Sequence, residues 1–127
     1  MAEALLAKGY SVACLVRQTS DLTELKNINV TLVEGDMTDR ESLIPAVRNA
    51  EIIFHLGGIT KAKTESAYFK INADGSRILY EVCLEHNPTI KKIVHVSSMA
   101  ASGPADPKKP RVESDPENPL TYYGKSK

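Results

Sequence analysis

The chain has 127 residues, with 16 basic and 16 acidic side chains, and 42% of its residues are hydrophobic. This length and composition are typical of one globular domain, and the zero net charge gives no sign of a nucleic-acid-binding surface. No apolar run approaches the ~18 residues of a membrane-spanning helix, and the N-terminus lacks the positive segment of a signal peptide.

The first quarter of the chain predicts a helix end, a strand and a turn. Residues 1–8 are rich in Ala and Leu and read as the end of a helix that Gly9 stops. Residues 11–16 (SVACLV) form a short apolar run, which predicts a strand buried on both faces. Residues 21–26 favour a helical turn.

The middle of the chain predicts two more strands and two helices. A strand over 30–33 is followed by a helix over 38–47, with its cap and first turn in the segment TDRE. A third strand covers 51–56. Apolar residues then recur at helical spacing over 65–86, and Pro88 ends that helix.

The last third predicts a strand over 93–97 and a surface loop over 102–119, which holds five of the seven prolines. Another helix begins in 119–127. Strands that alternate with helices, and that are apolar throughout, predict an α/β fold with a parallel sheet and helices on both faces.

The two cysteines, Cys14 and Cys83, lie inside apolar segments, as small core residues of a reduced protein do. We therefore expect a cytoplasmic protein without nucleic-acid or membrane partners. His55 and His95 lie in apolar strands with no second ligand at metal spacing, so we predict no metal site.

A tyrosine and a lysine near the C-terminus indicate chemistry. Tyr123 and Lys127 are four positions apart, which places them on one face of a helix. An ammonium beside a phenol favours the phenolate and lowers a pKa that starts near ~10. Such a tyrosine can exchange a proton with an alcohol, while Ser98 holds the substrate oxygen. The pattern is typical of nicotinamide-dependent alcohol oxidation and carbonyl reduction; the alternative is a chance pair on an exposed helix.

Two residues after strands suggest how a cofactor would be bound. Arg17 follows the first strand, where NAD-preferring folds place an acidic residue for the ribose 2′-hydroxyl. An arginine there can pair with a 2′-phosphate, which favours NADP over NAD, although a solvated surface arginine is the alternative. Asp36 ends the second strand and could equally cap the next turn.

Five motifs in order carry a family resemblance. They are Gly35-Asp36, His55-Leu56-Gly57-Gly58, Asn72 to Gly75, Val96-Ser97-Ser98 and Tyr123-x-x-x-Lys127. With them the chain resembles the extended short-chain dehydrogenase/reductases, and within that group it is similar to the NAD-dependent epimerase/dehydratase family. The segments 97–103 and 113–123 also resemble the dihydroflavonol-reductase-like members.

The resemblance implies a Rossmann-like fold and a catalytic set of three residues. Tyr123 would be the acid/base, Lys127 would grip the nicotinamide ribose hydroxyls and lower the pKa of the tyrosine, and Ser98 would hydrogen-bond the substrate hydroxyl or carbonyl. The activity implied is that of an NAD(P)-dependent oxidoreductase, epimerase or dehydratase acting on a sugar nucleotide or small metabolite.

The resemblance also implies cofactor contacts along the same edge of the sheet. Asp36 would accept from the adenine amino group, with Met37 against the ring. Asn72 would tie the central helix to the active-site strand. Small residues permit close backbone approach to the adenosine ribose and pyrophosphate, and the segment implied for this is Leu56, Gly57 and Gly58.

The chain departs from the family pattern in two respects. It has no Gly-x-x-Gly-x-x-Gly turn after a first strand, and nothing follows Lys127. We therefore expect residues 1–127 to be a partial dinucleotide-binding domain that lacks the first strand and the C-terminal substrate lobe. Without that central strand the sheet would have a gap of about 10 Å, twice the usual strand spacing.

The expected gap leaves three outcomes open. The chain could close it, borrow a strand from a partner or a second copy of itself, or be a piece of a longer polypeptide. Strand borrowing would suit a non-catalytic interaction module that pairs through its exposed strand edges.

Overall fold

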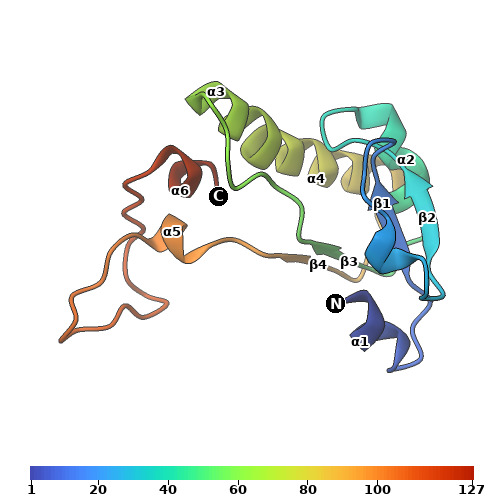
Figure 1. Ribbon diagram of the computed structural model, residues 1–127, viewed down its shortest axis with the longest axis horizontal. Helices are drawn as coiled ribbons and strands as arrows, with labels where there is room; N and C mark the ends of the chain where they lie inside the picture. Colours follow the sequence, from blue (N-terminus) through green and yellow to red (C-terminus); the bar gives the residue numbers. More distant parts are fainter.

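A computed structural model describes residues 1–127, in which short strands and helices alternate (Figure 1). In chain order the elements are α1 (Ala2–Leu6), β1 (Ala13–Val16), the 3₁₀ turn η1 (Thr23–Leu25), β2 (Thr31–Glu34), α2 (Arg40–Val47), β3 (Ile52–His55), α3 (Glu65–Tyr68), the π-helix η2 (Phe69–Asp74), α4 (Gly75–His86), β4 (Lys92–His95), α5 (Met99–Ser102) and α6 (Tyr122–Ser126). The four predicted strands are all present, each within two residues of its expected start. The short helix α5 was not predicted.

The strands form two separate parallel pairs. β1 pairs with β2 in the register Ala13 to Thr31, and β3 pairs with β4 in the register Ile52 to Lys92. No ladder joins β1 to β3. The parallel α/β fold is therefore confirmed, and the sheet is divided at the place where the gap was expected.

Contacts after the strands show that the two pairs point the same way. Met37 follows β2 and Gly57 follows β3, and a Cβ at Gly57 would lie 3.9 Å from Met37 Cγ. The carboxyl ends of both pairs therefore meet at one edge. Ligands of open α/β sheets bind at this edge.

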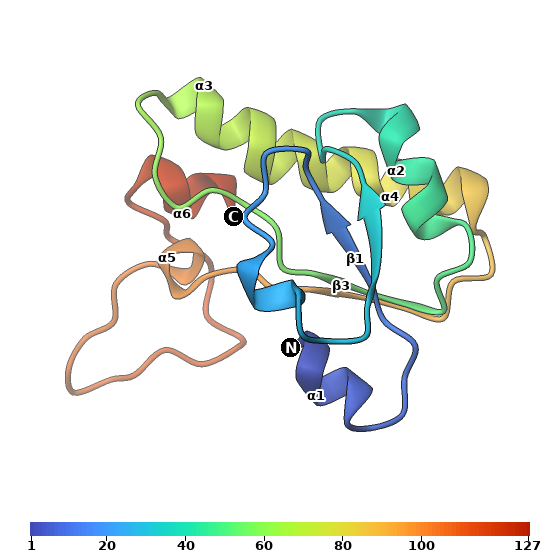
Figure 2. The same ribbon diagram turned by 45° about the vertical axis from the view of Figure 1, so that its right-hand side comes forward.

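A small core lies between α2 and α4, which pack against each other. Its buried members are Leu43, Val47, Leu79, Val82 and Cys83. Leu15 of β1 and Ile53 of β3 pack against it, so one helix layer covers both strand pairs. Figures 1 and 2 show α2, α3 and α4 on one side of the strands and α1 on the other.

Burial of β1 differs from the prediction. The strand was expected to be buried on both faces, but Ala13 is exposed and the next three residues are only half-buried. The reason is that β1 has a neighbouring strand on one side only. Cys14 in this strand and Cys83 in α4 are both free thiols.

The cap of α2 also differs from the prediction, which placed the cap at the start of the segment TDRE. Asp39 is the cap, because its carboxylate accepts from the backbone N–H groups of Glu41 and Ser42. The Thr38 hydroxyl donates instead to Asp36, at 2.7 Å. Thr38 and Asp39 are adjacent and both are residue types that favour the N-cap position. Asp39 takes that position, because the Thr38 hydroxyl is already bonded to Asp36.

The predicted helix over 65–86 is continuous but contains a π-helical turn, Phe69–Asp74. Asn72 lies in this turn and is buried. Short π-helical turns inside α-helices occur frequently at functional sites. The helix ends at His86 with Asn87 as its C-cap, one residue before Pro88.

The helices are all too short or too polar to span a lipid bilayer.

Candidate active site

Lys127 sits beside the ends of β3 and β4. Its ammonium donates to the Val96 carbonyl oxygen at 3.0 Å, and the Ser97 hydroxyl donates to the Lys127 carbonyl at 3.0 Å. Gly58 follows β3 with a φ of +152°, and a Cβ there would lie 3.4 Å from Lys127 Nζ. The ammonium is therefore held against a stretch of bare backbone.

Tyr123 lies in the helix α6, and Lys127 is the C-cap that follows its last residue, Ser126. The cap of this helix is Thr121, whose Oγ1 accepts from the Gly124 N–H at 3.0 Å. The half-buried Tyr123 ring lies near that of Tyr68 in α3, with centroids 6.1 Å apart. The Tyr123 hydroxyl makes no hydrogen bond within the protein, which leaves it free to meet a ligand.

Ser98 caps the neighbouring helix α5. Its Oγ accepts from the Ala100 N–H at 3.2 Å. The two helices approach closely, because a Cβ at Gly124 would lie only 2.3 Å from the Ala100 carbonyl oxygen. Only glycine allows this contact, which places Ser98 and Tyr123 on adjacent elements (Figure 1).

Asn72 joins α6 to the segment after β3. Its Oδ1 accepts from the Ile59 N–H at 2.8 Å, and its Nδ2 donates to the Ile59 carbonyl at 3.0 Å and to Ser126 Oγ at 2.9 Å. The family resemblance implied a tie from this residue to the active-site strand. The structure shows that its side-chain partners are the loop after β3 and the helix α6 instead.

The residues expected at the adenine end lie at the ends of β1 and β2. Asp36 accepts from the backbone N–H and the hydroxyl of Thr38, and these bonds hold its pKa below the ordinary value. The positive charges of Arg17 and Lys70 act in the same direction. Asp36 therefore does cap the next turn.

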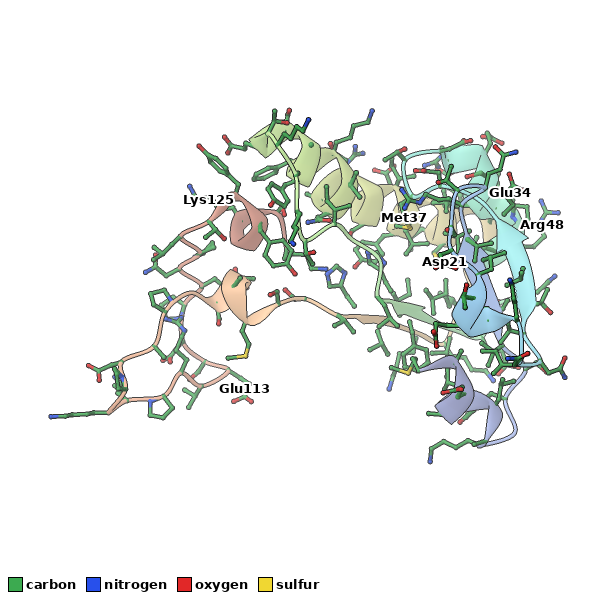
Figure 3. The ribbon with its side chains drawn as sticks, viewed as in Figure 1. Asp21, Glu34, Met37, Arg48, Glu113 and Lys125 are labelled. Carbon is green, nitrogen blue, oxygen red and sulfur yellow. The ribbon has the colours of Figure 1, made fainter.

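Met37 and the glycines complete this edge. A Cβ at Gly75 would lie 3.2 Å from Met37 Cβ, so the methionine packs where α4 begins (Figure 3). Leu56, Gly57 and Gly58 are exposed, apart from partial cover of the last by Lys127 and Asn72. The candidate residues thus line one edge, from Arg17 and Asp36 at one end to Ser98, Tyr123 and Lys127 at the other.

A buried histidine borders this edge and was expected only as a core or strand-face residue. His55 ends β3 and is 5% exposed, and its ring packs edge-on against His95 with centroids 4.8 Å apart. Its Nε2 lies 2.7 Å from Ser76 Oγ. Burial lowers the pKa of His55 to about 4, and the charges of His95 and Lys127 add to this.

Sequence reasoning missed Ser76 and Ser126, which are both buried. One signal was available: Ser76 is four residues after Asn72 on the same helix, close enough to bond its carbonyl. The pairing of Asn72 with Ser126 spans 54 residues and had no local signal.

Comparison with known proteins shows a family match and several relatives. A sequence model of the NAD dependent epimerase/dehydratase family matches residues 1–127. The sterol demethylase protein B of Methylococcus capsulatus is 29% identical over 105 residues, covering 81% of this chain and 31% of that protein. Across the first three curated relatives, the chain spans about a third of their length (31%, 34% and 32%).

Solved structures show the same arrangement of strands and helices. The crystal structure of gox2253 superposes with a TM-score of 0.87 at 30% identity, covering 98% of this chain and 39% of that one. The UDP-glucose 4-epimerase of Bifidobacterium longum, solved in complex with NAD+ and UDP, superposes with a TM-score of 0.77 at 28% identity, covering 98% of this chain and 41% of the other.

Proposed function

The chain belongs to the NAD-dependent epimerase/dehydratase family, and from that premise we propose that it takes part in NAD(P)-dependent oxidation or reduction at a hydroxyl- or carbonyl-bearing carbon. The observation that carries the proposal is the placement of Tyr123 in a short helix, with Lys127 as the C-cap of that helix, at the carboxyl edge of the strands. The substrate is a sugar nucleotide or a small metabolite, in keeping with relatives named for UDP-glucose and for sterols.

A nicotinamide cofactor fits the residues at this edge. The backbone is bare at Gly57 and Gly58, and a Cβ at Gly58 would crowd Lys127 and Asn72. When bound, the nicotinamide accepts or gives hydride at the substrate carbon. Arg17 takes part in no ion pair within the chain, so it is free to meet a 2′-phosphate, and NADP is therefore preferred over NAD.

The hydrogen bonds already made within the protein define what each side chain has left to offer. The Lys127 ammonium has three N–H donors and donates one to the Val96 carbonyl, so two remain for ribose hydroxyls. Ser98 Oγ accepts from Ala100, so its hydrogen is free to donate to a substrate oxygen. The unpaired Tyr123 hydroxyl then gives a proton to that oxygen or takes one from it.

The test compares the wild-type protein with Tyr123→Phe and the matched variant Tyr122→Phe. UDP-glucose and a sterol serve as probe alcohols with NADP+ and NAD+, and the appearance of the absorbance of the reduced cofactor reports their oxidation. We expect Tyr123→Phe to lower the rate about 100- to 10,000-fold, because it removes the proton-transfer group. Tyr122→Phe should keep most of the activity. Turnover that survives Tyr123→Phe contradicts the proposal.

A second function is favoured by the divided sheet. β1 and β3 each pair on one edge only, so their other edges offer unpaired backbone groups to an added strand. In this reading the chain is an interaction module that binds a strand of a second copy or of a partner. Light scattering after size-exclusion chromatography should then give a dimer or complex, whereas a well-folded monomer contradicts strand borrowing.

A further inference from the structure

Most of the buried polar side chains belong to one connected chain of hydrogen bonds. The structure buries five polar or charged residues, and four of them take part: His55, Asn72, Ser76 and Ser126. The bonds run from His55 to Ser76, from Ser76 to the Asn72 carbonyl, from the Asn72 side chain to Ser126, and from Ser126 to the Tyr123 carbonyl. This series of hydrogen bonds begins at His55 in β3 and ends at Tyr123 in α6.

Donors and acceptors in this chain fit in only one direction. Ser126 Oγ donates to the Tyr123 carbonyl at 2.8 Å, so it must accept from Asn72 Nδ2. Ser76 Oγ donates to the Asn72 carbonyl at 2.5 Å, so it must accept from His55 Nε2. His55 therefore carries a proton on Nε2. Burial lowers the pKa of His55 to about 4, so near pH 7 the ring is neutral and this is its single N–H.

The helix α6 depends on such ties for its position. It has five residues, and a helix of that length is not stable by itself in water. Ser126 lies in α6 between Tyr123 and Lys127 in the sequence, and its hydroxyl bonds the Asn72 side chain. Asn72 in turn lies in the π-helical turn, and its backbone carbonyl accepts a hydrogen bond from the Ser76 hydroxyl.

We propose that His55, Ser76 and Ser126 are positioning residues, which fix α6 through Asn72 and so set the Tyr123 ring and the Lys127 ammonium in place. This inference rests on the proposed function, because it assigns roles around the same two residues. His55 and Ser76 act through the π-helical turn, and Ser126 acts as the direct link.

The first test reads the hydrogen-bond chain by NMR and needs no turnover. It uses the 127-residue chain and the variants Ser76→Ala and Ser126→Ala, with Ser66→Ala on the exposed helix α3 as the matched control. We expect the Asn72 side-chain amide to exchange with solvent about ten-fold faster in Ser126→Ala, because one hydrogen bond is lost. Ser76→Ala should raise that exchange rate too, although Ser76 does not touch the amide.

Two further spectroscopic signatures, beside the Asn72 exchange rate, separate positioning from a general loss of stability. The ¹⁵N shifts of His55 should show the Nε2–H form in the wild type and lose that preference in Ser76→Ala. The Tyr123 ring resonances, which sense the Tyr68 ring, should shift in both variants. Ser76→Thr retains the hydroxyl and should restore all three signals. An unchanged Asn72 amide and unchanged Tyr123 resonances in Ser76→Ala overturn the proposal.

The second test uses the turnover assay of the previous section. Ser76→Ala and Ser126→Ala should lower kcat about ten-fold and leave the KM for the oxidised cofactor nearly unchanged, because both side chains are buried and bond only within the protein. Unchanged kcat in both variants overturns the positioning role even where the NMR signals move. If the wild type itself shows no turnover, the proposed function fails, and the NMR signals alone decide whether the chain of bonds sets the Tyr123 ring.

Discussion

Gly58 is the residue at which backbone conformation and candidate site meet most directly. Its φ of +152° is rare for any residue with a side chain, and a Cβ would lie 3.0 Å from Asn72 Oδ1 as well as close to Lys127. Gly57 beside it is different, because a Cβ there would meet its nearest neighbour at an ordinary 3.5 Å. Two adjacent glycines therefore carry different constraints.

We expect Gly58→Ala to lower the free energy of unfolding by about 1–3 kcal/mol, because it combines a strained φ with crowding of Asn72. The same change should weaken NADPH binding, because Lys127 must move. Gly57→Ala is the control and should cost less than about 1 kcal/mol. Urea denaturation and NADPH fluorescence measure both effects, and equal losses at the two glycines would contradict this account.

His55 predicts a pH dependence of stability. Its pKa is about 4 in the folded chain against 6.5 ordinarily, so the unfolded chain binds more protons between these values. The free energy of unfolding should therefore fall as pH drops from 6.5 to 4, by up to about 3 kcal/mol, and this contribution should level off below pH 4.

The measurement is urea denaturation as a function of pH for the wild type and for His55→Gln, which can still donate to Ser76 but does not titrate. The variant should show a flatter profile over this window. His95 titrates in the same sense, since its pKa is also lowered, so the difference between the two proteins is the informative quantity. His86→Gln at the end of α4 is the control, and parallel wild-type and His55→Gln profiles would count against the assignment.

Among the elements, α2 offers a direct test of its corrected cap. Asp39→Ala should lower the free energy of unfolding by about 1 kcal/mol, because two backbone N–H groups lose their acceptor. Asp39→Asn retains an acceptor oxygen and should cost only a few tenths of this. Urea denaturation compares the two, and a loss of the same size in both variants would show that charge, and not capping, carries the effect.

The sequence alone predicts some elements of the fold but not others. Apolar spacing was sufficient to predict the helix over 65–86 and all four strands, because periodicity is a local property. The π-helical turn at Asn72 was not predictable, since it depends on Ser76 and on contacts with Ile59 and Ser126. The spacing of Tyr123 and Lys127 was visible in the sequence, but the bonds between Lys127 and Val96 and between Ser126 and Asn72 are long-range pairings with no local signal.

For the molecule as a whole, one small core has to hold two strand pairs that do not bond to each other. Leu43 is fully buried in that core, while Leu84 on α4 is 74% exposed. We expect Leu43→Ala to lower the free energy of unfolding by about 2–5 kcal/mol, and Leu84→Ala by no more than about 0.5 kcal/mol. Thermal or urea unfolding measures both; a small loss at Leu43 would place the stabilising core elsewhere.

Lys127 is hydrogen-bonded to Val96 and Ser97, which follow β4. The position of its ammonium therefore depends on how β4 is aligned with β3. Because the ammonium is fastened to the Val96 carbonyl, it travels with that backbone. A slip of β4 along β3 by one position would carry the charge about 3.3 Å along the edge, away from Gly58 and Asn72. A misaligned conformer would thus keep its secondary structure yet lose the arrangement proposed for proton transfer.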